Sequence, residues 1–183
     1  MVAIDLGRTV SPVGLAEAKA WARIERGDED EVLALLLGAA SEAAESELGL
    51  AFGPRAFRLV MDEAPPDGWI AAPKRPVVSV DGVLAYDRRG EETSFDPRIH
   101  AAIAPDRASI RLSRAVFAAG ANGIDVTVTA GLASEEVPAE VKQAILIAAS
   151  AWFEMRLAVA DGGVHTMPAE ARRLLRPSRR VRL

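Results

Sequence analysis

The most regular part of the sequence is a strand-like stretch followed by a helix-like stretch. Residues 124–131 read Ile-Asp-Val-Thr-Val-Thr-Ala-Gly, and residues 137–144 read Val-Pro-Ala-Glu-Val-Lys-Gln-Ala. Every second residue of the first stretch is apolar until its end, which is the period of a strand with one buried face. Pro138 in the second stretch suits the first turn of a helix, where a missing N–H costs nothing. This succession predicts a β region that ends near Gly131 and a helix that begins at Pro138.

The helix after Pro138 is apolar over a wide arc. Its apolar positions recur at steps of three and four, as on a helical face. They are Val141, Ile145, Ala148, Trp152 and Met155, with Leu146 and Phe153 on a second flank. So wide an arc needs two partners, which in a monomer would be strands and another helix. In a ring, one partner could be a neighbouring subunit, and we predict that Val141, Ile145, Trp152 and Phe153 contribute to subunit packing.

Two more helices are predicted upstream. Ser11-Pro12 suits a helix start, and Gly27 an end. A second helix is predicted from Asp28 or Asp30 to Gly49. Its expected buried face is Val32, Leu36, Ala39 and Ala43, widened by Leu33 and Ala40, with Glu42, Glu45 and Glu47 off that face.

Between the helices, residues 55–131 alternate apolar and polar side chains and are interrupted by proline- and glycine-rich turns. We predict a small antiparallel sheet covered by helices on one face. The expected fold class is α+β and mainly helical: a helical core with an inserted β block and an extended C-terminal arm. The expected organisation is a helical domain over residues 1–161, with the β insertion at about 55–131, and a hinge and basic arm over residues 162–183.

Composition limits the class of protein. The chain has 183 residues, of which 50% are hydrophobic and 26% charged, and it contains no cysteine. Disulfides, thiolate zinc sites and a cysteine nucleophile are therefore excluded. No apolar run approaches the roughly 18 residues of a membrane span, and the N-terminus does not have a secretory pattern. We expect neither export nor membrane association.

The charge is unevenly distributed. The segment Val164–Leu183 has six arginines and one acidic residue, so it carries +5 while the remainder carries −9. A basic tail on an acidic body is typical of a segment that meets an acidic partner. The tail has no aromatic residue for base stacking, and its arginines alternate with aliphatic residues, which favours a protein groove over nucleic acid. The expected contact residues are Pro168, Arg172, Arg173, Leu174, Leu175, Arg176, Arg179, Arg180, Val181, Arg182 and Leu183.

No constellation of residues predicts catalysis. The only histidines, His100 and His165, lie near loop-like sequences, and the acidic groups at 28–31 and 135–136 precede helices, where helix capping and the helix dipole account for them. The glycines form neither a phosphate-binding loop nor a nucleophile elbow. We therefore predict a protein that is not an enzyme, with no catalytic residue, cofactor or metal site.

The succession of segments resembles the head–tail connector, or adaptor, family of tailed phages and phage-like gene transfer agents. The resemblance spans roughly Leu15 to Leu183. It rests on the opening helical pair, the proline-flanked stretch 73–80, and the strand–Gly–Val-Pro–helix succession that ends in Trp152-Phe-Glu-Met-Arg156. Met167-Pro168, Leu174-Leu175 and the final arginines resemble the family's C-terminal arm.

The resemblance implies a structural neck protein that is assembled in the bacterial cytoplasm. Twelve copies would form a ring beneath the portal protein, with the arms gripping the portal and the opposite face receiving the next neck protein, the stopper. DNA would pass through the ring without sequence-specific binding. Deleting residues 167–183 is expected to leave folded subunits that no longer join portal-bearing heads. The alternatives are a small DNA-binding protein that uses the arginine-rich tail, and an enzyme with a site in the β block.

Overall fold

The structure is a computed structural model that describes residues 1–63, 65, 67–155 and 166–179. It contains two compact units, each built from two chain segments. Residues Met1–Arg8 and Pro54–Leu132 form the β unit, and Thr9–Gly53 and Ala133–Leu183 form the helical unit. The predicted α+β class is confirmed, but the first eight residues join the β unit rather than the helices.

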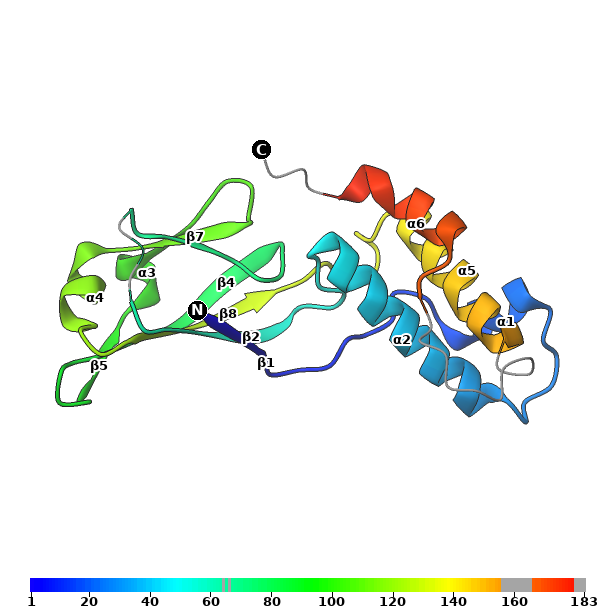
Figure 1. Cartoon of the computed structure of the whole chain (residues 1–183), viewed down its shortest axis with the longest axis horizontal. Helices are drawn as coiled ribbons and strands as arrows, with labels where there is room; N and C mark the ends of the chain where they lie inside the picture. The colour runs from blue at the N-terminus through cyan, green and yellow to red at the C-terminus, as the bar shows by residue number, and fades with distance from the viewer. Residues whose placement is uncertain (64, 66, 156–165, 180–183) are drawn as a thin grey trace. The chain divides into compact units, whose positions relative to one another are not determined.

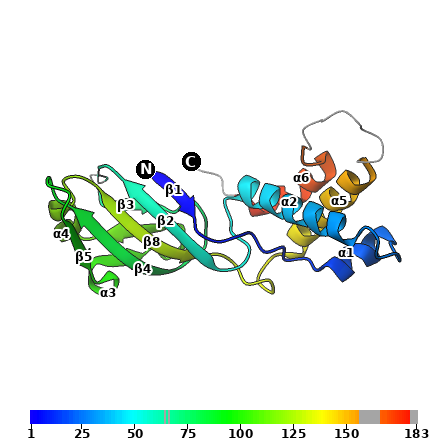
Figure 2. The same cartoon turned by 90° about the horizontal axis from the view of Figure 1, so that it is seen from below.

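The β unit contains an antiparallel five-stranded sheet in the order β1-β2-β8-β4-β5. Figure 2 shows these strands side by side. They are β1 (Val2–Asp5), β2 (Arg55–Met61), β8 (Ile124–Ala130), β4 (Val77–Tyr86) and β5 (Glu92–Phe95). Strand β8 is central because it pairs with β2 on one edge and β4 on the other. Val126 and Val128 are buried on one face of it, which confirms the alternation predicted for this stretch. On the other face Asp125 pairs with Arg58 of β2, and this carboxylate raises the pKa of Arg58.

Strand β1 is held at the sheet edge by a charged contact as well as by backbone pairing with β2. The Arg55 Nε donates to both carboxylate oxygens of Asp5, at 3.1 and 2.9 Å, and Nη2 donates to Oδ2 at 2.8 Å. Burial alone would raise the pKa of Asp5. The hydrogen bonds from Arg55 and from the Gly7 N–H, with the charges of Arg55 and Lys74, outweigh it, so the pKa is lowered.

A second, three-stranded sheet completes the β unit in the order β3-β7-β6. Its strands are β3 (Trp69–Ala71), β7 (Ser109–Leu112) and β6 (Ala101–Ile103). Two short helices, α3 (Pro97–His100) and α4 (Arg114–Ala119), adjoin it. Ile70 and Ile110, paired across β3 and β7, are buried in the core of this unit.

The helical unit contains four α-helices and a short 3₁₀ turn within its described residues (Figure 1). They are α1 (Leu15–Ala22), α2 (Asp30–Leu48), α5 (Ala139–Met155), α6 (Ala169–Leu175) and η1 (Arg176–Ser178). Helix α1 is shorter than predicted because Arg23 adopts the left-handed conformation, with φ of 56°, and ends it. Helix α2 ends as predicted, with Gly49 in the left-handed conformation that glycine adopts without strain. Lys19 Nζ contacts Asp30 Oδ1 at 2.6 Å and so links α1 to the start of α2.

Candidate interaction surfaces of the helical unit

The described part of the C-terminal segment is a helix that packs on its own chain. Helix α6 lies against α5 and also contacts α2 (Figure 1). Ala171 and Leu175 are fully buried one helical turn apart, and Met167 is also buried. This differs from the extended arm expected over residues 162–183, because the apolar side of this segment finds a partner in α5. Residues 156–165, with the expected hinge, and residues 180–183 lie outside the described part.

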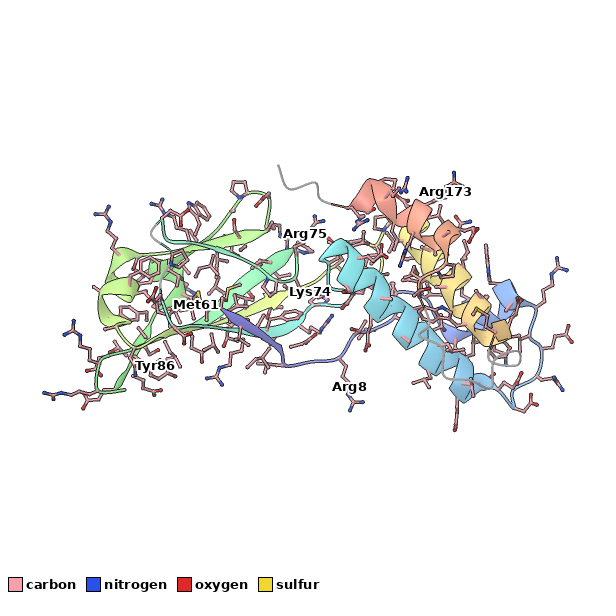
Figure 3. The ribbon with its side chains drawn as sticks, in the orientation of Figure 1. Arg8, Met61, Lys74, Arg75, Tyr86 and Arg173 are labelled. Carbon is pink, nitrogen blue, oxygen red and sulfur yellow. The ribbon has the colours of Figure 1, made fainter. Side chains whose placement is uncertain are left out.

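The basic side chains of α6 and η1 are presented outward. Arg172 is also exposed, but its Nε donates to Glu47 Oε1 on α2 at 3.1 Å. Arg173, Arg176 and Arg179 are exposed, and none pairs with a carboxylate among the described residues. Figure 3 shows Arg173 on α6. This surface, Arg173 with Arg176 and Arg179, is called the arginine row below.

The structure therefore divides the predicted contact residues. The arginine row is accessible, Leu174 and Pro168 are half-buried, and Leu175 is in the core of the helical unit. Leu175 cannot reach a partner while α6 is folded on α5. Arg180, Val181, Arg182 and Leu183 fall outside the described residues, and their contact with a partner stays a prediction.

The residues expected to pack between subunits lie mostly inside the helical unit. Val141, Ile145 and Trp152 are buried on α5, and Phe153 is half-buried. Helix α5 contacts α1, α2 and α6, so its wide apolar arc finds several partners in the same chain. The Trp152 Nε1 donates to the Thr166 carbonyl at 3.3 Å, which links α5 to the segment that enters α6. Contact of these residues with a neighbouring copy remains untested.

Helix α2 has an apolar outer face that sequence reasoning assigned wrongly. The expected buried positions Val32 and Ala39 are exposed, whereas Leu37 and Ala44 are buried along with Leu33 and Ala40. Leu35 is 73% exposed and Val32 is 39% exposed. The outer apolar face comprises Val32, Ala34, Leu35, Gly38 and Ala39, with Glu31 before it and Glu42 after it. A helix that is apolar on both sides is typical of an element with a second partner.

A shallow apolar groove lies between α1 and α5. Its volume is about 430 Å³, and Ala20, Trp21 and Leu146 form much of its lining. Trp21 is 47% exposed, which is high for an indole. Lys142 and Glu17 bring charges of both signs to the same groove. The helical unit thus has an outer apolar face on α2 and an apolar groove on a different pair of helices, α1 and α5.

Glu45 is a further residue that the sequence analysis placed incorrectly, because it is 2% exposed despite its charge. Its Oε1 accepts from the Phe52 backbone N–H at 2.5 Å, and its Oε2 from the Thr9 hydroxyl at 3.2 Å. The carboxylate therefore joins three separate parts of the helical unit. Its role is structural, since a buried backbone N–H requires a partner.

The histidine and acidic side chains that the structure describes give no sign of a metal site. Among the described residues, no three His, Cys, Asp or Glu side chains lie close enough to hold a metal ion. His100 Nδ1 lies 2.8 Å from Ser113 Oγ, and His165 is outside the described residues. No helix in the described part of the chain is long and apolar enough to cross a membrane.

Comparison with known proteins gives the class of this fold. Three chains of solved structures match it with TM-scores of 0.78, 0.77 and 0.73 and identities of 24%, 23% and 24%, each over 100% of this chain and 97% of the solved chain. The structures are titled "Neck of empty GTA particle computed with C6 symmetry", "Virion of native gene transfer agent (GTA) particle" and "Neck of native GTA particle computed with C12 symmetry". The fold is therefore one found in gene transfer agent particles.

A family comparison gives a more specific similarity over part of the chain. Residues 13–100, just under half of the chain, match the family described as "Phage gp6-like head-tail connector protein". The curated proteins include no match. The predicted resemblance to head–tail connector proteins is confirmed over this segment, and the shared fold extends over the whole chain.

Proposed function

We propose that this protein is a structural head–tail adaptor of a gene transfer agent or phage-like particle. Copies of it form a ring in the particle neck, beneath the portal, and join the head to the next neck protein. The observation that carries the proposal is the shared fold over the full chain with chains of gene transfer agent particles, two of them from neck structures, together with the connector-family match. The C12 symmetry of one of those structures supports a ring of twelve copies.

Two surfaces of the helical unit support self-association. In a closed ring, each copy presents one surface to the neighbour before it and a different surface to the neighbour after it. The outer apolar face of α2 and the groove between α1 and α5 are two such surfaces on one subunit. Lys142 beside the groove offers a charge partner for the exposed Glu42 that follows the α2 face. Burying Leu35 against a neighbour would contribute about 1.5–3 kcal/mol per copy.

Charge supports passage of DNA through the ring without specific binding. The segment from Thr9 to Gly53 contains nine acidic and three basic residues. Acidic surface repels phosphate, so a duplex can slide past it. The arginine row and residues 180–183 are the parts we assign to the portal, where guanidinium groups can pair with carboxylates. Each contact is weak alone, and repetition around a ring multiplies the avidity.

The test is electron microscopy of the purified full chain, alone and mixed with the portal protein. We expect rings of the wild-type protein, and loss of rings with folded subunits retained in Leu35→Asp, because a charge at the α2 face cannot be buried there. Ser46→Asp is the matched control, since it adds the same charge to an exposed position of the same helix. Monomers of the wild-type protein that do not join portal would contradict the proposal. If the protein instead binds duplex DNA in a salt-sensitive way, and substitution of the arginine row abolishes that binding, a DNA-binding protein is favoured.

A further inference from the structure

A pocket in the β unit has features of a binding site and is separate from the surfaces assigned to the ring and the portal. Its volume is about 610 Å³, within the range typical of ligand pockets. Three chain segments line it: the turn into β3, the junction of α3 and β6, and the junction of β7 and α4. The side chains that matter for its chemistry are Asp67, Trp69, Ile99, His100, Arg111 and Arg114.

The pocket is held in shape by short hydrogen bonds between its three segments. His100 Nδ1 lies 2.8 Å from Ser113 Oγ, and the Ser113 backbone N–H donates to the His100 carbonyl at 2.9 Å. The Leu112 N–H donates to the Gly68 carbonyl at 3.1 Å. Gly68 has φ of 77°, and a Cβ there would lie 3.1 Å from the Phe117 ring, so the turn requires glycine. A ligand would therefore meet a site that is already formed, which lowers the entropic cost of binding.

The charge of the pocket is positive and incompletely paired. Arg111 and Arg114 are both exposed, and within the described residues neither contacts a carboxylate. The Arg111 guanidinium lies 5.8 Å from the centroid of the Trp69 ring, a contact that orients it. Asp67 is the one acidic side chain among the described lining residues, and its Oδ1 already accepts from the Trp69 backbone N–H at 3.1 Å. Two guanidinium groups beside one hollow, with that of Arg111 oriented by the Trp69 ring, suit a carboxylate.

Apolar surface next to these charges narrows the ligand class. Ile99 is 74% exposed, and Trp69 is 39% exposed. Ala101, Ala102 and Phe117 contribute further apolar lining. Single-stranded nucleic acid would need an open aromatic face for base stacking, whereas the Trp69 ring already has Arg111 over it. A ligand with an aliphatic side chain next to a carboxylate would match both the apolar lining and the two arginines.

We propose that this pocket binds an acidic, aliphatic peptide segment of a partner protein, with Arg111 and Arg114 pairing with its carboxylate and Ile99 and Trp69 contacting its aliphatic side chain. The proposal concerns the β unit alone, and it holds whether or not the helical unit forms a ring. It assigns a second contact function to the chain, distinct from portal attachment by the arginine row.

The test uses fluorescence anisotropy of a labelled peptide, acetyl-Glu-Leu-Asp-Leu-amide, titrated with the full-length protein. The comparison peptide replaces Glu and Asp by Gln and Asn, and a labelled single-stranded DNA tests the competing ligand class. We expect saturable binding of the acidic peptide, binding of the amide peptide weaker by roughly tenfold or more, and little response to the DNA. The double variant Arg111→Gln with Arg114→Gln should bind the acidic peptide more weakly than wild type by about the same factor.

The matched control is Arg88→Gln with Arg89→Gln, which removes two exposed positive charges from the same unit but outside the pocket. It should leave the affinity nearly unchanged, and circular dichroism should show that both double variants are folded. The proposal is overturned if the acidic peptide does not bind, if both peptides bind equally, if the two double variants lose affinity equally, or if the DNA binds in place of the peptide. None of these outcomes depends on ring formation, so failure here and failure of the proposed adaptor function are distinguishable.

Discussion

Leu175→Ala is the substitution that most directly tests how the C-terminal segment is used. Leu175 is fully buried where α6 meets α5, so truncation removes apolar contacts and leaves a cavity. Leu→Ala changes at such sites cost about 2–5 kcal/mol, and helix α5, which also contacts α2, is expected to relax only partly into the space. We expect the free energy of unfolding to fall by about 3 kcal/mol, a large part of the usual total for a domain.

The matched control is Leu174→Ala, one residue earlier on the same helix. Leu174 is half-buried, so we expect a loss of about 1 kcal/mol or less. The measurement is urea denaturation followed by circular dichroism at the helical band, because most of the described helical residues belong to this unit. Both variants must be compared at one protein concentration, since assembly would add to the apparent stability. Equal losses below about 1 kcal/mol would refute the assignment of α6 to the core.

The burial of Leu175 also decides how the proposed portal contact of the C-terminal segment should be tested. Deletion of residues 167–183 was expected from the sequence to leave folded subunits. The structure places Met167, Ala171 and Leu175 in the core, so that deletion would also remove part of the helical unit. Substitution of the exposed arginines is therefore the cleaner test of portal attachment, because it leaves the packing of α6 on α5 intact.

Local periodicity is enough to predict the elements that have a regular apolar pattern. Strand β8 and helix α5 each have one clear apolar pattern, and both form close to the predicted residues. Helix α2 was harder because residues 32–37 are apolar in every direction, so the sequence does not fix which side faces the core. The burial of Leu37 rather than Val32 is decided by packing against α5.

The features that sequence reasoning missed depend on distant partners. Strand β1 pairs with β2, more than fifty residues away, and short terminal strands give little signal by themselves. Glu45 looked like a solvent-facing acid, because its partners Thr9 and Phe52 lie outside its own helix. Leu175 is predicted from the sequence as a contact residue for another protein because arginines surround it, whereas in the folded subunit it is buried. In each case tertiary contact overrides the local pattern.

Two charged contacts give further predictions. Glu45→Ala should lower the free energy of unfolding by about 1–3 kcal/mol, because it removes the carboxylate oxygen that accepts from the buried Phe52 N–H. Glu45→Gln keeps an acceptor oxygen and should cost less. Urea titrations compare the two variants, and equal costs would contradict the hydrogen-bond explanation. The second concerns pH. The pKa of Asp5 is lower in the folded state than its ordinary value of 3.8, so its contribution is fully present above that value and is lost as the pH falls through the folded pKa. The stability difference between wild type and Asp5→Asn should therefore shrink on acidification below about pH 4. A difference that stays constant to the lowest pH at which the protein folds would mean that the ion pair with Arg55 does not stabilise β1.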